Sequence, residues 1–168
     1  MNVAIIGYGY WGPNLVRNFW KNQNFKVTHV VDFENSKLKL VNRDYPTILT
    51  TTNYNDILKN PSIDCVVIAT PVHTHYKLAK QALKSKKHVL IEKPLTNSHN
   101  TEKELVELAK KLNLILIVDN TYLYTSAIQK ISQISEYFHN ITIFPPCRSR
   151  PTSLASCLLW LAEMLFMG

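Results

Sequence analysis

The sequence predicts a doubly wound α/β domain, in which helices cover both faces of a parallel sheet. Two observations predict this class. Short apolar runs alternate with amphipathic segments along most of the chain. The run at 63–69 shows no polar alternation after Asp64, as expected for a strand that is covered on both faces. In addition, three of the four glycines lie within residues 7–12, directly after the first apolar run.

Strands are expected where Val, Ile and Leu form short runs. Parallel neighbours in a sheet require a crossover segment, and a helical pattern follows almost every run. The predicted strands are, in chain order, 2–6, 26–31, a short one at Ile48, 63–69, 87–91 and 114–118.

Helices are expected between these strands, where apolar residues recur at helical spacing. Pro13 suits the first turn of the first helix, because the N–H that proline lacks would have no partner there. Right-handed crossovers then connect the strands. The predicted helices are, in chain order, 12–22, 35–43, the helical turn 54–59, 74–85, 98–112 and 125–138.

The chain is basic, with a formal net charge of +7 from 19 Lys and Arg against 12 Asp and Glu. The lysines are spread over helix faces and form no stripe with interleaved aromatic residues. Nucleic-acid binding requires such a stripe or a recognisable motif, so no nucleic-acid partner is expected. The positive field would still attract a phosphorylated ligand.

The cysteines favour a reducing compartment. There are three, none in a C-x-x-C pair, and Cys65 lies inside an apolar run.

No signal peptide is recognised at the N-terminus. The apolar run at 154–167 contains Glu163 and falls short of the roughly 20 residues that span a bilayer. We therefore expect a cytoplasmic protein that does not bind membranes.

The composition changes near residue 141. Before this point there are 15 Lys, 15 Asn and 12 Ile, and after it Lys and Asn are absent. The sequence predicts a dinucleotide-binding domain over 1–122, a helix within 123–140 leading towards a substrate domain, and an atypical tail over 141–168. One hypothesis for the tail is a frameshift or other gene disruption. A natural C-terminal helix or a membrane anchor is the alternative.

The stretch "GYGYWG" carries the glycine pattern G-x-G-x-x-G at Gly7, Gly9 and Gly12. It follows a predicted strand and opens a predicted helix, the context of a Rossmann dinucleotide site. Gly7 would allow the tight turn, Gly9 the approach of a pyrophosphate to the backbone, and Gly12 close packing of the helix. Tyr8, Tyr10 and Trp11 of the same loop would then also contact the cofactor. The alternative is a structural turn with no ligand.

Asp32 ends the second predicted strand, 20 residues after Gly12. An acid at this place accepts hydrogen bonds from both ribose hydroxyls and repels a 2′-phosphate, so NAD is favoured over NADP. No Lys or Arg occurs at 33–36 to bind that phosphate, and Lys37 is the nearest base. The alternative is an Asp that only caps the turn after the strand.

Two further segments follow strands. In "ATPVHTH", Thr70 and Pro71 would pass near the nicotinamide half of the cofactor. His73 and His75 lie two residues apart and do not share a helix face, so no metal site is expected and His75 is interpreted as a helix-start or pocket-wall residue.

In "IEKPL", Lys93 would lie at the carboxyl end of a strand. There it could hydrogen-bond a ribose of the cofactor or a substrate hydroxyl, and help to shift the proton of that hydroxyl. On the residues alone, an ordinary surface lysine is the alternative.

The three segments "GYGYWG", "ATPVHTHYKLA" and "EKPL" occur in the order and spacing of the glucose–fructose oxidoreductase, inositol dehydrogenase and rhizopine-catabolism (Gfo/Idh/MocA) family, which the chain resembles over about residues 1–135. The resemblance implies that Lys93 is catalytic or orients the substrate and that its bond to Pro94 is cis. It also implies that Thr70, His75 and Glu92 lie in or beside the cofactor pocket. "DNTYLY" departs from the family pattern, with Asp119 and Asn120 in place of Gly and His. Asn120 still offers an amide for the cofactor.

The resemblance, closest to its sugar-nucleotide branch, implies hydride transfer between a sugar or UDP-sugar hydroxyl and NAD. The family's substrate domain, which normally builds its homo-oligomers, is not recognised in 141–168, so we expect little dehydrogenase activity from this chain alone. A truncated, inactive remnant that binds NAD is the alternative. A third candidate, a Rossmann-type binder of another nucleotide-linked ligand, is disfavoured by the Glu-Lys-Pro segment.

Overall fold

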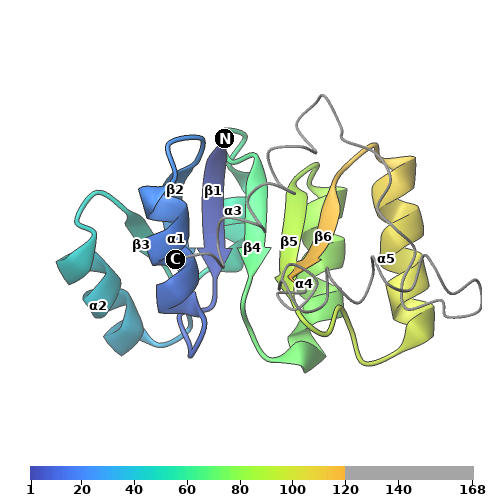
Figure 1. The fold of residues 1–168 in the computed structure, drawn as a ribbon, viewed down its shortest axis with the longest axis horizontal. Coiled ribbons are helices and arrows are strands. Elements are labelled where there is room, and N and C mark those ends of the chain that lie inside the picture. Colours follow the sequence, from blue (N-terminus) through green and yellow to red (C-terminus); the bar gives the residue numbers. More distant parts are fainter. Residues whose placement is uncertain (120–168) are drawn as a thin grey trace, which may run out of the picture. The chain divides into compact units, whose positions relative to one another are not determined.

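The computed structural model describes residues 1–119, which form one of the two units into which the chain divides, Met1–Asp119 and Asn120–Gly168. Strands and helices alternate through the described unit (Figure 1). The strands are β1 (Asn2–Ile6), β2 (Lys26–Val31), β3 (Leu49–Thr51), β4 (Cys65–Ile68), β5 (His88–Glu92) and β6 (Leu116–Asp119). The helices are α1 (Gly12–Lys21), α2 (Asn35–Asp44), α3 (Tyr54–Lys59), α4 (Val72–Lys84) and α5 (His99–Lys111).

The six strands form one sheet in the order β3-β2-β1-β4-β5-β6, and every neighbouring pair is parallel. This confirms the doubly wound α/β class. The chain builds outward from β1 in one direction and then, from β4, in the other (Figure 1). The strand order reverses between β1 and β4, and ligands of such sheets bind outside the carboxyl ends of the strands at this point.

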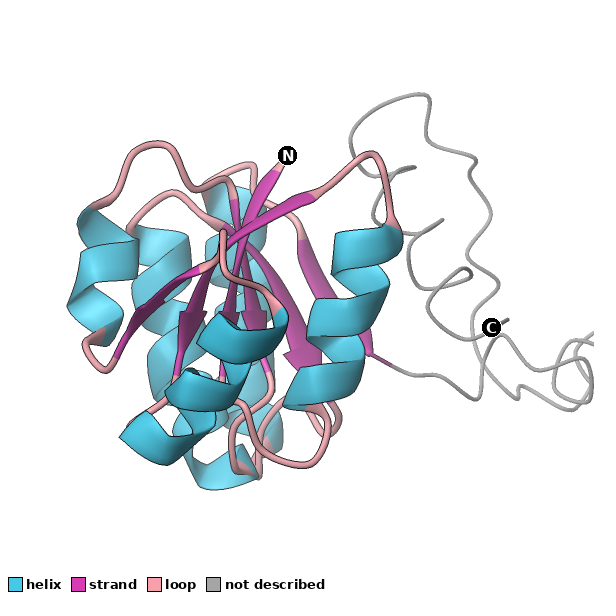
Figure 2. Cartoon of the chain, turned by 90° about the vertical axis from the view of Figure 1, so that its left-hand side faces the viewer, coloured by secondary structure: helices cyan, strands magenta, loops and turns pink. Residues whose placement is uncertain are grey.

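Helices cover both faces of the sheet (Figure 2). On one face α3, α4 and α5 bury Ile57, Leu83 and Leu105 against alternate strand residues such as Ile68 and Ile91. On the other face α1 and α2 contribute their buried sides, which consist of Leu15, Val16, Phe19, Leu38 and Val41. The strands therefore carry apolar side chains in both directions, which explains why their sequences lack polar alternation.

The ends of several elements differ from the sequence-based expectation by one to three residues. Ile48 is buried but closes a turn onto Tyr45, so β3 begins at Leu49. Helix α4 begins at Val72, because Pro71 takes the N-cap position. Lys87 precedes β5 rather than opening it, and its ammonium donates to the carbonyl oxygens of Asn60 and Ile63.

The helix predicted at 125–138 and the predicted boundaries at 122, 123–140 and 141–168 fall outside the described residues. Within residues 1–119, no helix has the length and apolar character that crossing a membrane requires.

Candidate functional site

The glycine-rich loop leaves the carboxyl end of β1 through a backbone that only glycine adopts easily. Gly7 has φ +97°, and its N–H donates to the carbonyl oxygen of Val31 at 2.7 Å. A Cβ atom on Gly7 would stand 2.6 Å from the carbonyl oxygen of Ala69, closer than any real contact of this kind. The first glycine is therefore required by the turn itself and by the approach of the segment that follows β4.

Gly12 and Gly9 serve different purposes. A Cβ atom on Gly12 would stand 2.5 Å from the carbonyl oxygen of Gly7, so Gly12 allows the start of α1 to close against the turn. A Cβ atom on Gly9 would meet nothing within 4 Å. No atom of the described residues thus explains the glycine at position 9, whereas a ligand that lies against the backbone would.

The N-terminus of α1 opens directly from this loop. The residue at its N-cap, Trp11, makes no side-chain hydrogen bond to the helix, and no acidic residue occupies the first turn. Pro13 stands in that turn, as the sequence predicts. The first backbone N–H groups of a helix have no intrahelical partner, and the helix dipole adds positive potential there. An anion such as a pyrophosphate is the natural partner of these groups.

The three aromatic residues of the loop do not share one environment. Tyr8 is buried, and burial raises the pKa of its phenol. Tyr10 is 86% exposed and Trp11 46% exposed, and their rings pack edge to face with centroids 5.3 Å apart. The backbone of Tyr8 belongs to the loop while its side chain belongs to the core. Of the three rings, only those of Tyr10 and Trp11 are available to a ligand.

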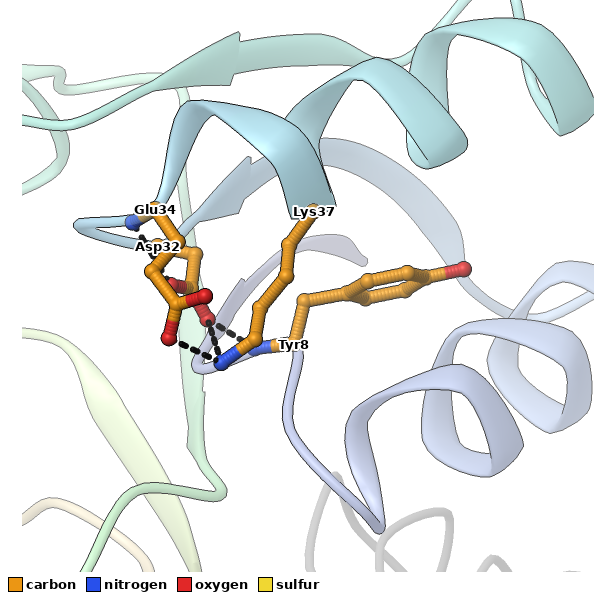
Figure 3. Close-up of polar contacts among 4 residues, drawn as sticks. All are labelled: Tyr8, Asp32, Glu34 and Lys37. Atoms are coloured by element: carbon orange, nitrogen blue, oxygen red, sulfur yellow. Dashed lines mark hydrogen bonds and ion pairs between the residues drawn. The ribbon is translucent and has the colours of Figure 1, made fainter.

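Asp32 is held in place at the end of β2, as Figure 3 shows. One carboxylate oxygen accepts the backbone N–H of Tyr8 at 2.7 Å, and the other accepts that of Glu34 at 2.9 Å. Asp32 is only 6% exposed. A carboxylate oxygen has two lone pairs, so each oxygen can accept one further hydrogen bond, for example from a ribose hydroxyl.

A cation stands beside this carboxylate. The ammonium of Lys37 lies 3.9 Å from Asp32 and donates to Glu34 at 2.7 Å (Figure 3). The hydrogen bond to Glu34 raises the pKa of Lys37, so the charge is retained. Lys37 also lies 5.5 Å from the ring centroid of Phe33, which is 80% exposed. The sequence identifies Lys37 as the nearest base, but its pairing with Glu34 needed the structure.

His75 joins the segments that follow β4 and β5. Its ring is 1% exposed and lies between two carbonyl oxygens, that of Thr70 at 2.7 Å from Nε2 and that of Pro94 at 2.9 Å from Nδ1. Thr70 in turn shares a hydrogen bond with Thr74 at 2.6 Å. His75 therefore fixes the relative position of these two segments, and Pro71 lies exposed between Thr70 and the helix.

Lys93 lies exposed directly after β5, and the peptide bond from Lys93 to Pro94 is cis, as the resemblance implies. Glu92, the last residue of β5, is half-buried, and burial raises its pKa. The exposure of Lys93 fits both a residue that meets a substrate and an ordinary surface lysine. Its place at the carboxyl end of the strand next to β4 is what makes it a candidate for catalysis.

Residues 1–120 match the oxidoreductase family GFO_IDH_MocA, which is described by its NAD-binding Rossmann fold. The chain belongs to this family. The uncharacterized oxidoreductase YdgJ of Escherichia coli is 34% identical over 118 residues, which are 70% of this chain and 34% of that protein. The levoglucosan dehydrogenase of Pseudarthrobacter phenanthrenivorans is 29% identical over 136 residues, 76% of this chain and 35% of its own length.

Among solved structures, that of GenD2 from gentamicin A biosynthesis in complex with NAD has the same fold. It gives a TM-score of 0.75 at 23% identity and covers 80% of this chain and 38% of its own. The chain spans about a third of the length of the curated relatives it matches. What these comparisons establish is a Gfo/Idh/MocA oxidoreductase domain with an NAD(P)-binding Rossmann fold.

The structure brings most of the predicted site residues to one edge of the Gfo/Idh/MocA sheet. The carboxyl ends of β1, β2, β4 and β5 supply the glycine loop, Asp32, the Thr70 segment and Lys93. Direct contacts connect them in pairs, from Tyr8 to Asp32 and from His75 to Pro94. Asn120 lies outside the described residues. Within residues 1–119, no three His, Cys, Asp or Glu side chains group as metal ligands.

One residue at this edge was not among the predicted site residues. Asp119, where the Gfo/Idh/MocA pattern has glycine, is 3% exposed, and its Oδ1 has no hydrogen-bond partner among residues 1–119. Burial and the neighbouring Glu92 raise the pKa of Asp119 to about 7. The departure from the family pattern was visible in the sequence. The proximity to Glu92 follows from strand register, which a single sequence does not display.

Proposed function

We propose that this chain binds NAD as part of an oxidoreductase that transfers hydride between a sugar or UDP-sugar hydroxyl and the cofactor. The observation that carries the proposal is the open space at Gly9, beside the N-terminus of α1. Gly7 and Gly12 are explained by contacts within the protein, but Gly9 is not. A pyrophosphate on the backbone at Gly9 would occupy that space, and its oxygens would accept hydrogen bonds from the free N–H groups of the helix.

The acidic end of β2 supports NAD rather than NADP as the cofactor. Asp32 has one lone pair free on each carboxylate oxygen for the ribose hydroxyls. Glu34 adds a second carboxylate, and Lys37, the only cation beside Asp32 among the described residues, is held by Glu34 at 2.7 Å. A 2′-phosphate would meet two carboxylates and one cation that is already paired, so repulsion dominates.

Lys93 is the proposed catalytic residue. NAD, when bound, supplies the hydride acceptor. The task left to the protein is to hold the substrate hydroxyl and move its proton, and Lys93 offers an exposed ammonium or amine at the sheet edge for this purpose. His75 would keep the turn at Pro94, and with it Lys93, in a fixed position. The sugar substrate is proposed from the likeness to a protein named levoglucosan dehydrogenase.

A second candidate is that this chain by itself binds NAD without turning it over. The first relatives are matched over only 34% and 36% of their own length, so the reaction of the whole protein is proposed here separately from NAD binding. For either candidate we propose a cytoplasmic location, since the buried free thiol of Cys65 fits a reducing compartment.

Two measurements on the 168-residue chain test the proposal. Calorimetric titration with NAD and NADP should show tighter binding of NAD, and equal or stronger binding of NADP would contradict the cofactor choice. Incubation with NAD and a panel of sugars and UDP-sugars, followed at the absorbance of NADH, tests the reaction. Turnover that is lost in Lys93→Met supports the dehydrogenase. Binding of NAD with no turnover of any substrate supports the second candidate.

A further inference from the structure

Glu92 and Asp119 face each other across two neighbouring strands. They are register partners at the carboxyl ends of β5 and β6. The residues before them, Ile91 and Val118, both pack in the core beneath α4 and α5. Because side chains alternate along a strand, Glu92 and Asp119 both project from the opposite face of the sheet. Adjacent strands lie about 4.8 Å apart, so the two carboxyl groups are close neighbours.

The surroundings do not support two negative charges at this distance. Asp119 is 3% exposed, and its buried Oδ1 accepts no hydrogen bond from any described residue. Glu92 is half-buried. Burial raises the pKa of both carboxyl groups, and the charge of Glu92 raises that of Asp119 further. Two carboxyl groups that share a poorly solvated site avoid double ionisation by keeping one proton.

The charged groups around the pair are arranged unequally. The backbone N–H and the ammonium of Lys93 both favour the ionised form of Glu92 and lower its pKa. For Asp119 the described residues supply only the repulsion from Glu92. From α4, His75 contacts the turn after β5 through the carbonyl oxygen of Pro94. Negative charge is thus favoured on Glu92 and the proton on Asp119.

We propose that Glu92 and Asp119 share one proton at neutral pH, held chiefly by Asp119, and present a single negative charge beside Lys93. The pair can then accept or release one proton at the edge of the sheet where Lys93 stands. Its use in hydride transfer rests on the function proposed above, with Asp119 as a positioning residue that sets the charge of Glu92. The shared proton itself follows from the strand register and the burial.

The test is a titration of the carboxyl carbons by ¹³C NMR on the full, isotope-labelled chain between pH 4 and pH 9. Signals are assigned with Asp119→Asn and Glu92→Gln. We expect the Asp119 carboxyl carbon to titrate near pH 7 in the wild type. In Glu92→Gln its midpoint should fall, because the neighbouring charge is gone. Glu107→Gln, on the exposed side of α5, is the matched control and should leave the midpoint unchanged.

A single Asp119 transition near pH 4 in the wild type would overturn the proposal, as would a midpoint that is the same in Glu92→Gln. If either variant does not fold, the wild-type curve still decides. A carboxyl transition near pH 7 supports the shared proton, and carboxyl transitions confined to the region of pH 4 contradict it. Calorimetric binding of NAD at pH 6 and pH 8 separates this inference from the proposed function. Absence of binding at both values would overturn that function, while the carboxyl titration would still report on the shared proton.

Discussion

The carbonyl oxygen of Gly7 lies 2.5 Å from the point where a Cβ atom on Gly12 would stand. The backbone of the turn after β1 thus lies directly against the backbone at the start of α1. Two of the three glycines in the fingerprint hold the loop in its shape, and the third lies beside open space. This division separates the folding role of the motif from its binding role.

Gly12→Ala should destabilise the fold. The new methyl group would meet backbone rather than a flexible side chain, so the loop or the helix must shift. We expect a loss of about 1–3 kcal/mol in the free energy of unfolding, in the range of overpacked sites. Urea denaturation measures this loss. A midpoint equal to that of the wild type would contradict the prediction, because it would show that the loop moves to accommodate the methyl group without a cost in stability.

Asp32→Asn should weaken discrimination between the two cofactors. The amide keeps one acceptor oxygen for the N–H of Tyr8 or Glu34, but it removes the negative charge that repels a 2′-phosphate. We expect the preference for NAD over NADP in calorimetric titrations to fall by about tenfold or more, roughly 1.4 kcal/mol. Asp44→Asn, at an exposed carboxylate paired with Arg43, is the control. An unchanged ratio would remove Asp32 from the specificity site.

His75→Ala should destabilise the protein and loosen the turn at Pro94. The change removes the ring N–H that donates to one of the two carbonyl oxygens, that of Thr70 or that of Pro94, and a buried polar group left unpaired costs about 1–3 kcal/mol. His73→Ala removes an exposed ring two residues away and should have little effect. Chemical denaturation of the two variants checks this prediction, and equal stabilities would show that the ring of His75 does not hold the segments together.

Asp119 should make the fold less stable as the pH rises. Its pKa in the folded chain is about 7, against 3.8 for an ordinary Asp, so between these values the folded state binds more protons than the unfolded state. Stability therefore falls as pH increases through this window and stays low above it. The rise of the pKa from 3.8 to about 7 limits this loss in the free energy of unfolding to about 4 kcal/mol at most.

The corresponding experiment is urea denaturation of wild type and Asp119→Asn at several pH values. The stability of Asp119→Asn relative to wild type should rise from pH 5 to pH 8, because the variant loses the cost of ionising Asp119. Glu107→Gln should follow the wild-type profile. Parallel curves for Asp119→Asn and wild type would mean that Asp119 ionises without penalty.

Local sequence patterns were sufficient to predict the sheet and part of the candidate site. The spacing of Gly7, Gly9 and Gly12 between a strand and a helix, with Asp32 after the next strand, depends on short-range geometry and was readable from one sequence. The ends of elements were less readable. Ile48 is as apolar as a strand residue, but it lies in a turn, where its N–H donates to the carbonyl oxygen of Tyr45.

The contacts that the sequence did not predict all join segments far apart in the chain. His75 acquires its role only through Pro94, 19 residues later. Asp119 meets Glu92 because β5 and β6 pair in one particular register. Periodicity indicates that a strand exists, but it does not show which residue of the neighbouring strand lies opposite a given residue.

The proposed cofactor site is tested most directly by Gly9→Ala. Isothermal titration calorimetry compares the affinity of this variant and of wild type for NAD, and thermal unfolding compares their stabilities. Because a Cβ atom there meets no atom of the part of the chain that the structure describes, the variant should unfold at the wild-type temperature or slightly above it. The same methyl group would stand where the pyrophosphate approaches the backbone, so the affinity for NAD should fall at least about tenfold. A Gly9→Ala chain that binds NAD as tightly as wild type would contradict the central claim, as would a folded wild-type chain that does not bind NAD.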